Sequence, residues 1–157
     1  LLEKSQSARI IHVTTGFAVK YAGGLKINHL NHFDTSVKTY CRSKLYLRLF
    51  NYELAKRLAN SNVDTFSVHP GDCYTNLFTD MSALFKFFTR IWMLSQRSVK
   101  KASEAIIHCI DADDLQQLSG KHFENLKPTH HDAPIGTNSR LSEDLWNKSM
   151  EIVKLPY

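Results

Sequence analysis

The chain has 157 residues, of which 43% are apolar and 22% charged, the composition of one ordinary globular domain with a buried core. Its formal net charge of +5 is modest for this length and argues against a dedicated nucleic-acid-binding protein. Three widely spaced cysteines, Cys41, Cys73 and Cys109, form no CxxC pair, so we expect core thiols in a reducing intracellular compartment rather than a disulfide framework. No apolar run reaches about eighteen residues, so no segment is expected to span a membrane.

The first residues, LLEKSQSARI, carry neither an initiator methionine nor a signal-peptide pattern, and they resemble the end of a helix that leads into a strand. We therefore expect the chain to begin within a fold. Residues 8–15, ARIIHVTT, are β-branched and mostly apolar, which predicts a strand buried on both faces of a parallel sheet. Gly16 ends this strand, and Gly23-Gly24 with the polar run NHLNHFDTS predict a loop.

Apolar residues then recur at helical spacing, which predicts a helix over residues 39–59. The sequence NSN turns the chain into VDTFSVHPG, residues 63–71, a second strand that ends at Pro-Gly. A strand, a helix and a strand of these lengths form a right-handed parallel crossover.

The remaining elements follow the same alternation. We expect a short aromatic segment over residues 81–94, a helix over 99–111, a third strand in SGKHFENL, a proline-containing loop over 127–138 and a closing helix over 139–153. Three parallel strands with helical crossovers predict an α/β fold, part of a Rossmann-type doubly wound parallel sheet. It is about half of such a sheet, because doubly wound sheets usually carry more strands.

Two tyrosines in the helix over 39–59 each precede a lysine by one turn: Tyr40 with Lys44, and Tyr52 with Lys56. Most isolated pairs of this kind are ordinary helix surface. Tyr40, however, begins its helix just after a strand and a glycine loop, where side chains reach the carboxyl end of a parallel sheet and where such folds bind ligands. Tyr52 lies about 120° further around the helix and cannot share that site, so we interpret it as structural.

The spacing of Tyr40 and Lys44 suits acid/base chemistry, because side chains at i and i+4 share one helix face. A phenol has a reference pKa of about 10, and a nearby ammonium stabilises the phenolate and lowers that pKa toward neutrality. Hydride transfer to a carbonyl requires a group that supplies such a proton. The pair therefore predicts an acid/base tyrosine with its electrostatic helper.

Four segments in order resemble the short-chain dehydrogenase/reductase family, and within it the retinol dehydrogenase-like branch: ARIIHVTT, YCRSKLYLRLFNYELAKRL, VDTFSVHPGDCYTNLF and SGKHF. The resemblance covers nearly the whole chain. It implies that residues 1–157 are the carboxyl-terminal part of one Rossmann-type dehydrogenase domain whose dinucleotide-binding half lies upstream. That upstream half would carry the glycine-rich phosphate loop, the residue that selects NAD or NADP, and the catalytic asparagine.

The resemblance also implies roles for individual residues. Tyr40 is the catalytic acid/base, and Lys44 holds the nicotinamide ribose and lowers the tyrosine pKa. The turn containing Pro70 and Gly71, with Thr75, packs against the nicotinamide end of the cofactor, for which NADP(H) is favoured over NAD(H). Counting back from Tyr40 places Thr15 where the family has a serine that holds the substrate oxygen. Threonine keeps that hydroxyl but adds a methyl group and a stiffer χ1, which could alter substrate positioning or reduce activity.

Asn28, in NHLNHF, superficially copies an asparagine-containing helix of the family. It follows the first strand, whereas the family's asparagine precedes that strand, so we leave Asn28 out of the site.

Histidines suggest a metal site at first sight, namely His29 with His32, and His130 and His131 beside Asp132. These patterns lack cysteine partners and the three or four convergent ligands that zinc needs, so we expect no metal. His69 precedes the Pro-Gly turn and is interpreted as a residue that shapes the cofactor pocket rather than a catalytic one.

Residues 81–101, MSALFKFFTRIWMLSQRSVKK, contain five lysines or arginines and no acid, with apolar residues at helical spacing. Two interpretations stay open and are compatible for a lipid substrate: a helix that lies in a membrane interface, and a lid over the active site. Basic residues among aromatics also suit single-stranded nucleic acid, but the apolar stripe is too continuous for that partner.

These observations predict an NAD(P)-dependent oxidoreductase that acts on an alcohol/carbonyl pair of a retinoid, a steroid or another lipophilic small molecule. A homodimer, and association with the endoplasmic reticulum membrane through an upstream segment, stay open. The competing hypothesis is a non-catalytic fragment or an interaction protein that keeps the half-fold without binding a cofactor. An upstream TGxxxGIG loop would favour the enzyme.

Overall fold

The computed structural model describes residues 1–25, 27, 30, 35–72, 98–124, 126–129 and 135–154. It is an α/β fold with one sheet in the order β1-β2-β3-β4. Strands β1 (Ala8–Val13), β2 (Val63–His69) and β3 (His122–Glu124) are parallel, and β4 (Lys127–Pro128) pairs antiparallel with β3. The predicted α/β class and the three parallel strands are confirmed.

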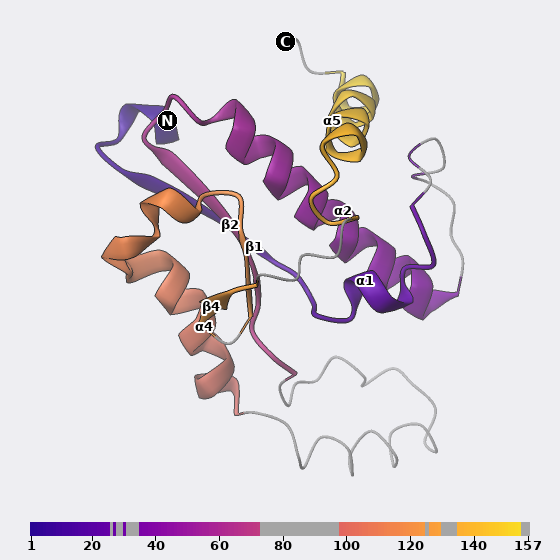
Figure 1. Ribbon diagram of the computed structural model, residues 1–157, viewed down its shortest axis with the longest axis horizontal. Coiled ribbons are helices and arrows are strands. Elements are labelled where there is room, and N and C mark those ends of the chain that lie inside the picture. Colours follow the sequence, from indigo (N-terminus) through magenta and orange to yellow (C-terminus); the bar gives the residue numbers. More distant parts are fainter. Residues whose placement is uncertain are drawn as a thin grey trace.

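Helices cover both faces of the sheet (Figure 1). α2 (Ser36–Arg57) and α5 (Ser139–Val153) lie on one side, and α4 (Val99–Asp111) lies on the other. The boundaries of α4 and α5 agree with those expected, whereas α2 begins three residues earlier than expected and ends two residues earlier. Between Gly16 and the predicted loop, in residues for which no element was expected, α1 (Ala18–Tyr21) forms a short helix whose Ala18 packs with Cys41 and Leu45 of α2.

The strand register brings the carboxyl ends of β1 and β2 together. β1 pairs with β2 from Ala8↔Val63 to Val13↔Val68. Beyond the last pair, Thr14 donates its backbone N–H to the Val68 carbonyl over 2.8 Å. Because α2 is the crossover between these strands, its first turns lie near the carboxyl end of β1. This places Tyr40 at the carboxyl end of the sheet.

The expectation that β1 is buried on both faces is wrong. Its residues are half-buried, and Val13 at its carboxyl end is 40% exposed. The reason is topological: within the described part of the chain, β1 has a paired strand on one side only, so it is the edge of the sheet. β2 lies between β1 and β3, and its residues are mostly buried. It therefore has the burial that the apolar run of residues 8–15 predicted for β1.

The apolar core lies between the sheet and α4. Phe66 and Phe123 meet edge to face with their ring centroids 5.6 Å apart, and both pack with Val68, Ala105 and Cys109. The side chain of Ser98 caps α4 by accepting a hydrogen bond from the Lys101 N–H over 3.2 Å.

Arg9 joins β1 to the other end of α4. Its guanidinium donates to the carbonyls of Cys109, Ile110 and Ala112 over 3.2, 2.7 and 2.7 Å. These carbonyls are among those that a helix leaves without internal partners.

The third strand is shorter than predicted. The segment SGKHFENL forms β3 only over His122–Glu124, because a turn at Gly120, with φ +88°, precedes the strand. The 3-10 helix η4 (Asp113–Leu118) leads into this turn. A second 3-10 helix, η1 (Leu2–Lys4), stands where the end of an amphipathic helix was expected, and it has no buried residue. β4 was not anticipated, and it lies in the segment expected to be a loop.

Candidate active site

The structure brings the helix of Tyr40 and Lys44 to the carboxyl end of β1. The Lys44 Nζ lies 5.8 Å from the centroid of the Tyr40 ring and donates a hydrogen bond to the Val13 carbonyl over 3.2 Å. Thr15 follows two residues after Val13 and is buried, and its Oγ1 accepts a hydrogen bond from the Phe17 N–H over 3.4 Å. Lys44 therefore tethers the predicted acid/base helix to the strand end that precedes the predicted substrate-binding hydroxyl.

The pKa of Tyr40 departs from the expectation. The side chain is 43% exposed, and the pKa of its hydroxyl lies above the ordinary value, first because of partial burial and then because of the charges of Cys41 and Asp72. The predicted lowering by Lys44 is therefore not seen in this chain.

Asp72 is the group near Tyr40 that the sequence reasoning missed. Its carboxylate is close enough to disfavour a phenolate at Tyr40. The signal was available in the sequence, because an acidic residue follows directly after the Pro-Gly turn that the resemblance placed beside the cofactor.

The Pro70-Gly71 turn follows β2 at the same carboxyl end of the sheet. Both residues are half-buried, and Gly71 has φ +86°, a conformation that L side chains rarely adopt. With Lys44 and the partly exposed side chain of Tyr40, this end of the sheet offers an ammonium, a phenol and a backbone turn, the chemistry that fits a ribose and a planar ring. Thr75 lies outside the described residues. The described residues thus fit the nicotinamide end of the implied cofactor.

Gly16 allows a close approach between strands at this edge. A Cβ added there would lie 2.9 Å from His69 Cδ2 and 3.3 Å from Glu124 Oε1, so the imidazole packs directly on the Gly16 backbone. His69 therefore lies beside the residue that follows Thr15. This position agrees with a role in shaping the site.

The second tyrosine-lysine pair is part of a helix-helix contact. Lys56 Nζ lies 2.7 Å from Glu53 Oε2 and 3.2 Å from Ser139 Oγ, and Arg57 Nε lies 3.0 Å from Glu53 Oε1. Burial alone would raise the pKa of Glu53, but hydrogen bonds and charge from Lys56, Ser142 and Arg57 outweigh it and hold that pKa below its ordinary value. These contacts join α2 to α5 and support the structural interpretation of Tyr52 and Lys56.

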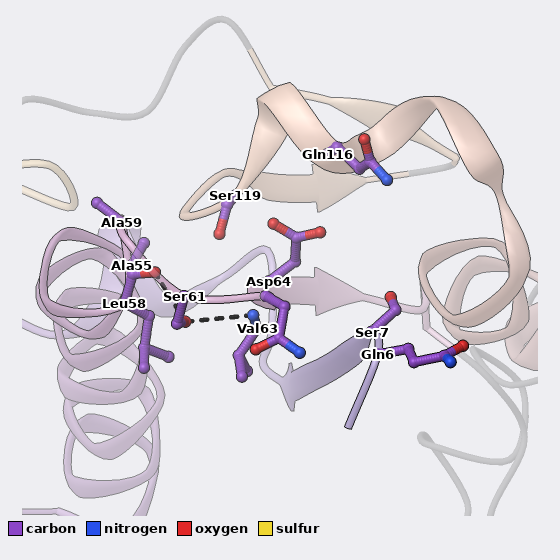
Figure 2. Close-up of a pocket in the computed structure, with 11 residues that line it drawn as sticks. Gln6, Ser7, Ala55, Leu58, Ala59, Ser61, Val63, Asp64, Gln116 and Ser119 are labelled. Atoms are coloured by element: carbon purple, nitrogen blue, oxygen red, sulfur yellow. Dashed lines mark hydrogen bonds between the residues drawn. The ribbon is translucent and has the colours of Figure 1, made fainter. Parts of the chain in front are cut away.

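A pocket of about 440 Å³ lies at the opposite, amino end of the strands (Figure 2). It lies between the carboxyl end of α2, the first residues of β2 and η4, and Asp64 is its one charged lining residue. Tyr40 and Ala55 are fifteen residues apart on α2, a distance of about 22 Å along the helix axis, so this pocket is separate from the site around Tyr40. No sequence motif indicated this pocket, because small and polar residues from four separate segments form it.

The structure describes some of the other residues singled out in the sequence, namely two of the cysteines, but not the histidine pairs. Cys41 and Cys109 are buried free thiols; burial raises the pKa of both, that of Cys109 to about 11. Among the described residues, no three His, Cys, Asp or Glu side chains converge as a metal site would require. In the same part of the chain, no helix has the length and apolar character needed to cross a membrane. Asn28, His29, His32, Cys73, residues 81–97, His130, His131 and Asp132 lie outside the described residues.

The fold and the position of Tyr40 and Lys44 define a class of protein: a Rossmann-type α/β domain with a tyrosine-lysine pair at the carboxyl end of its sheet. The crystal structure of an uncharacterised protein from Mycobacterium paratuberculosis is similar, with a TM-score of 0.59 and 21% identity over 96% of this chain and 52% of that one. At this identity, the likeness shows the fold alone. No protein-family model matches the chain.

Particular relatives follow from sequence comparison. The chain is 34% identical to human retinol dehydrogenase 12 over 97% of its length, and 30% identical to human retinol dehydrogenase 13 over 98%. It is 29% identical to mouse retinol dehydrogenase 11 over 99%. The chain spans about half the length, 48%, of each of these curated relatives. It is thus a homologue of the retinol dehydrogenases of the short-chain dehydrogenase/reductase family, which confirms the resemblance.

Proposed function

We propose that the protein containing this chain is an NAD(P)-dependent oxidoreductase of the short-chain dehydrogenase/reductase type. It interconverts an alcohol and a carbonyl on a lipophilic small molecule, a retinoid or a steroid. The observation that carries the proposal is the hydrogen bond from Lys44 to the Val13 carbonyl, which fixes the Tyr40 helix at the carboxyl end of β1. The retinol dehydrogenase names of the relatives support the substrate class.

The residues divide the chemistry among them. The cofactor, when bound, supplies or accepts the hydride at the reacting carbon. Tyr40 gives its hydroxyl proton to the carbonyl oxygen during reduction and takes a proton from the alcohol during oxidation. Thr15 donates a hydrogen bond to the same oxygen, and Lys44 holds the ribose. Because the pKa of Tyr40 lies above its ordinary value, the tyrosine is present as the phenol, the form that reduction requires.

The remaining parts of the proposal concern binding and context. Pro70, Gly71 and Thr75 contact the nicotinamide end of the cofactor, with NADP(H) favoured over NAD(H). Residues 81–101 meet the lipophilic substrate or a membrane surface. Residues 1–157 form the carboxyl-terminal part of one dehydrogenase domain. A homodimer and an endoplasmic reticulum location stay predictions.

A non-catalytic role is the second candidate. One observation favours it: the environment of Tyr40, with Asp72 nearby, raises the pKa of the phenol rather than lowering it. A phenol of raised pKa is a weaker proton donor, and its phenolate is less populated near neutrality. Such a protein would keep the half-fold for interaction and lose the catalytic proton transfer.

One experiment separates the two candidates. We would express the longest natural chain that contains these residues and measure NADPH-linked reduction of a retinoid aldehyde. We expect Tyr40→Phe to abolish turnover and the matched Tyr52→Phe to leave it unchanged. Equal loss in both variants would contradict the choice of Tyr40, and a folded protein with no turnover on retinoid, steroid or simple aliphatic aldehydes would favour the non-catalytic role.

A further inference from the structure

The sheet face toward α2 carries a row of polar side chains. The strand register pairs His12 with Ser67 and Ser67 with His122, so these three residues lie side by side across β1, β2 and β3. We call this row the histidine layer. Its neighbours in the strands, such as Phe66 and Phe123, point to the opposite face and form the apolar core with α4. His12 contacts α2 through Phe50, and Thr65, on the same face of β2, donates a hydrogen bond to Asn51 Oδ1 of α2 over 2.8 Å.

The His122 imidazole is buried and the His12 side chain is half-buried, and a ring nitrogen of each is buried without a hydrogen-bond partner in the described structure. Ser67 Oγ lies 3.0 Å from His122 Nδ1, with Ser67 and His122 only 1% and 2% exposed. Within the described part of the chain, the Nε2 atoms of His12 and His122 have no hydrogen-bond partner. Glu124 Oε1 lies 3.5 Å from His122 Nε2 but does not form a hydrogen bond with it. The burial of Ser67 excludes a hydrolytic serine, since no substrate could reach its hydroxyl.

Charge around the histidine layer opposes protonation. Burial, then the positive charge of Arg48 on α2 and the neighbouring His69, lower the pKa of His122 to about 3. Burial also lowers the pKa of His12. The carboxylate facing His122 in the described structure is that of Glu124 on β3, and it is 37% exposed, so solvent screens it. A proton on either imidazole would place a buried positive charge between the sheet and α2.

The histidine layer also lies next to the packing that holds α2. The His12 ring meets Phe50 of α2 edge to face, with centroids 5.9 Å apart. Phe50 in turn stacks on Trp146 of α5, with centroids 5.0 Å apart and an interplanar angle of 16°. A change at His12 therefore reaches both helices on this side of the sheet.

We propose that the histidine layer is an acid-sensitive lock that holds α2 against the sheet, closed while His12 and His122 are neutral and opened by their protonation. α2 carries Tyr40 and Lys44, so opening would separate Lys44 from the Val13 carbonyl to which it is bonded. This device lies in the fold of the chain itself. It does not depend on the proposed enzymatic function.

The direction of the pH dependence follows from proton linkage. An imidazole whose pKa is lower in the folded state than in the unfolded state, where it is 6.5, favours folding fully only above that value. As pH falls below it, the unfolded state binds protons that the folded state cannot accept. Each such histidine multiplies the unfolding constant by up to about ten for every unit of pH.

Trp146 provides the reporter for a test. The chain contains two tryptophans, so Trp92→Phe leaves Trp146 as the sole indole. Urea unfolding of the 157-residue chain, at a concentration where light scattering shows a monomer, is followed by Trp146 fluorescence from pH 7.5 to pH 5 and gives the unfolding constant at each pH. We expect the unfolding constant of the wild type to rise as the pH falls. His122→Asn keeps a polar group beside Ser67 and should reduce this rise by up to about tenfold per pH unit.

The control is His108→Asn, because His108 lies on α4 against the other face of the sheet, with its ring 6.1 Å from Phe123. It should leave the steepness unchanged. If His122→Asn does not fold, His12→Asn tests the same row with the same expected direction. Hydrogen exchange should show that acid exposes α2 amides before α4 amides.

Three results would overturn the lock: a wild-type unfolding constant that is independent of pH in this range, equal steepness in the wild type and the histidine-layer variant, or the same reduction in His108→Asn. The first needs no variant, so the proposal stays testable even if both substitutions prevent folding.

Discussion

Arg9 offers a sharp test of how β1 holds α4. Its guanidinium donates three hydrogen bonds to carbonyls at the end of α4, at 3.2, 2.7 and 2.7 Å. A hydrogen bond involving a charged group contributes about 1.5–3 kcal/mol when buried, and the bond to Ile110 is exposed and contributes little. A positive charge at a helix carboxyl terminus adds roughly 0.3–1 kcal/mol. The bonds to Cys109 and Ala112 are part-buried, so each is assigned the lower part of the first range, about 1.5–2 kcal/mol. We therefore expect Arg9→Met to lower the free energy of unfolding by about 3–5 kcal/mol.

Urea unfolding at pH 7.5 measures this loss, with a midpoint expected to fall by about 1.5–2.5 M for a slope of roughly 2 kcal/mol per M. The control is Arg9→Lys, which keeps the charge but replaces the planar fork by a single ammonium. It should recover only part of the loss. Amide exchange should rise first at the carboxyl end of α4. A loss below about 0.5 kcal/mol in Arg9→Met, the usual range for surface substitutions, would refute the bridging role.

Three further predictions concern the candidate site. In the longest natural chain that contains these residues, Lys44→Ala should weaken cofactor binding, measured by calorimetric titration. It should also shift the pH profile of turnover to higher pH, because removing a positive charge near Tyr40 raises the pKa of its phenol further. An unchanged profile would show that Lys44 does not act on the tyrosine. Thr15→Ser should preserve or raise turnover and the isosteric Thr15→Val should lower it, and unchanged turnover in the valine variant would make Thr15 structural. The 157-residue chain alone should show no measurable binding of NADPH or NADH by calorimetry and should associate through the open edge of β1 by light scattering. A soluble monomer that binds either cofactor with micromolar affinity would contradict that reasoning.

Local patterns in the sequence determined much of the fold. Apolar residues at helical spacing located α4 and α5 at their observed boundaries. β-branched runs ended by glycine or proline located β1 and β2, and their order predicted the parallel crossover that the register shows. The spacing of Tyr40 and Lys44 after a strand and a glycine loop indicated the candidate site. Each of these signals depends on neighbours within a few turns of the chain.

Other features depend on which segments meet, and no local pattern encodes that. ARIIHVTT has the composition of a central strand, yet β1 is an edge strand because only its partner β2 lies beside it in the described structure. The pKa of Tyr40 is raised first by partial burial and then by the charges of Cys41 and of Asp72, which lies thirty-two residues away in the sequence. His12, Ser67 and His122 form one layer only when three strands align in register. Burial and electrostatic environment are properties of the assembled sheet and helices, so the tertiary structure alone decided them.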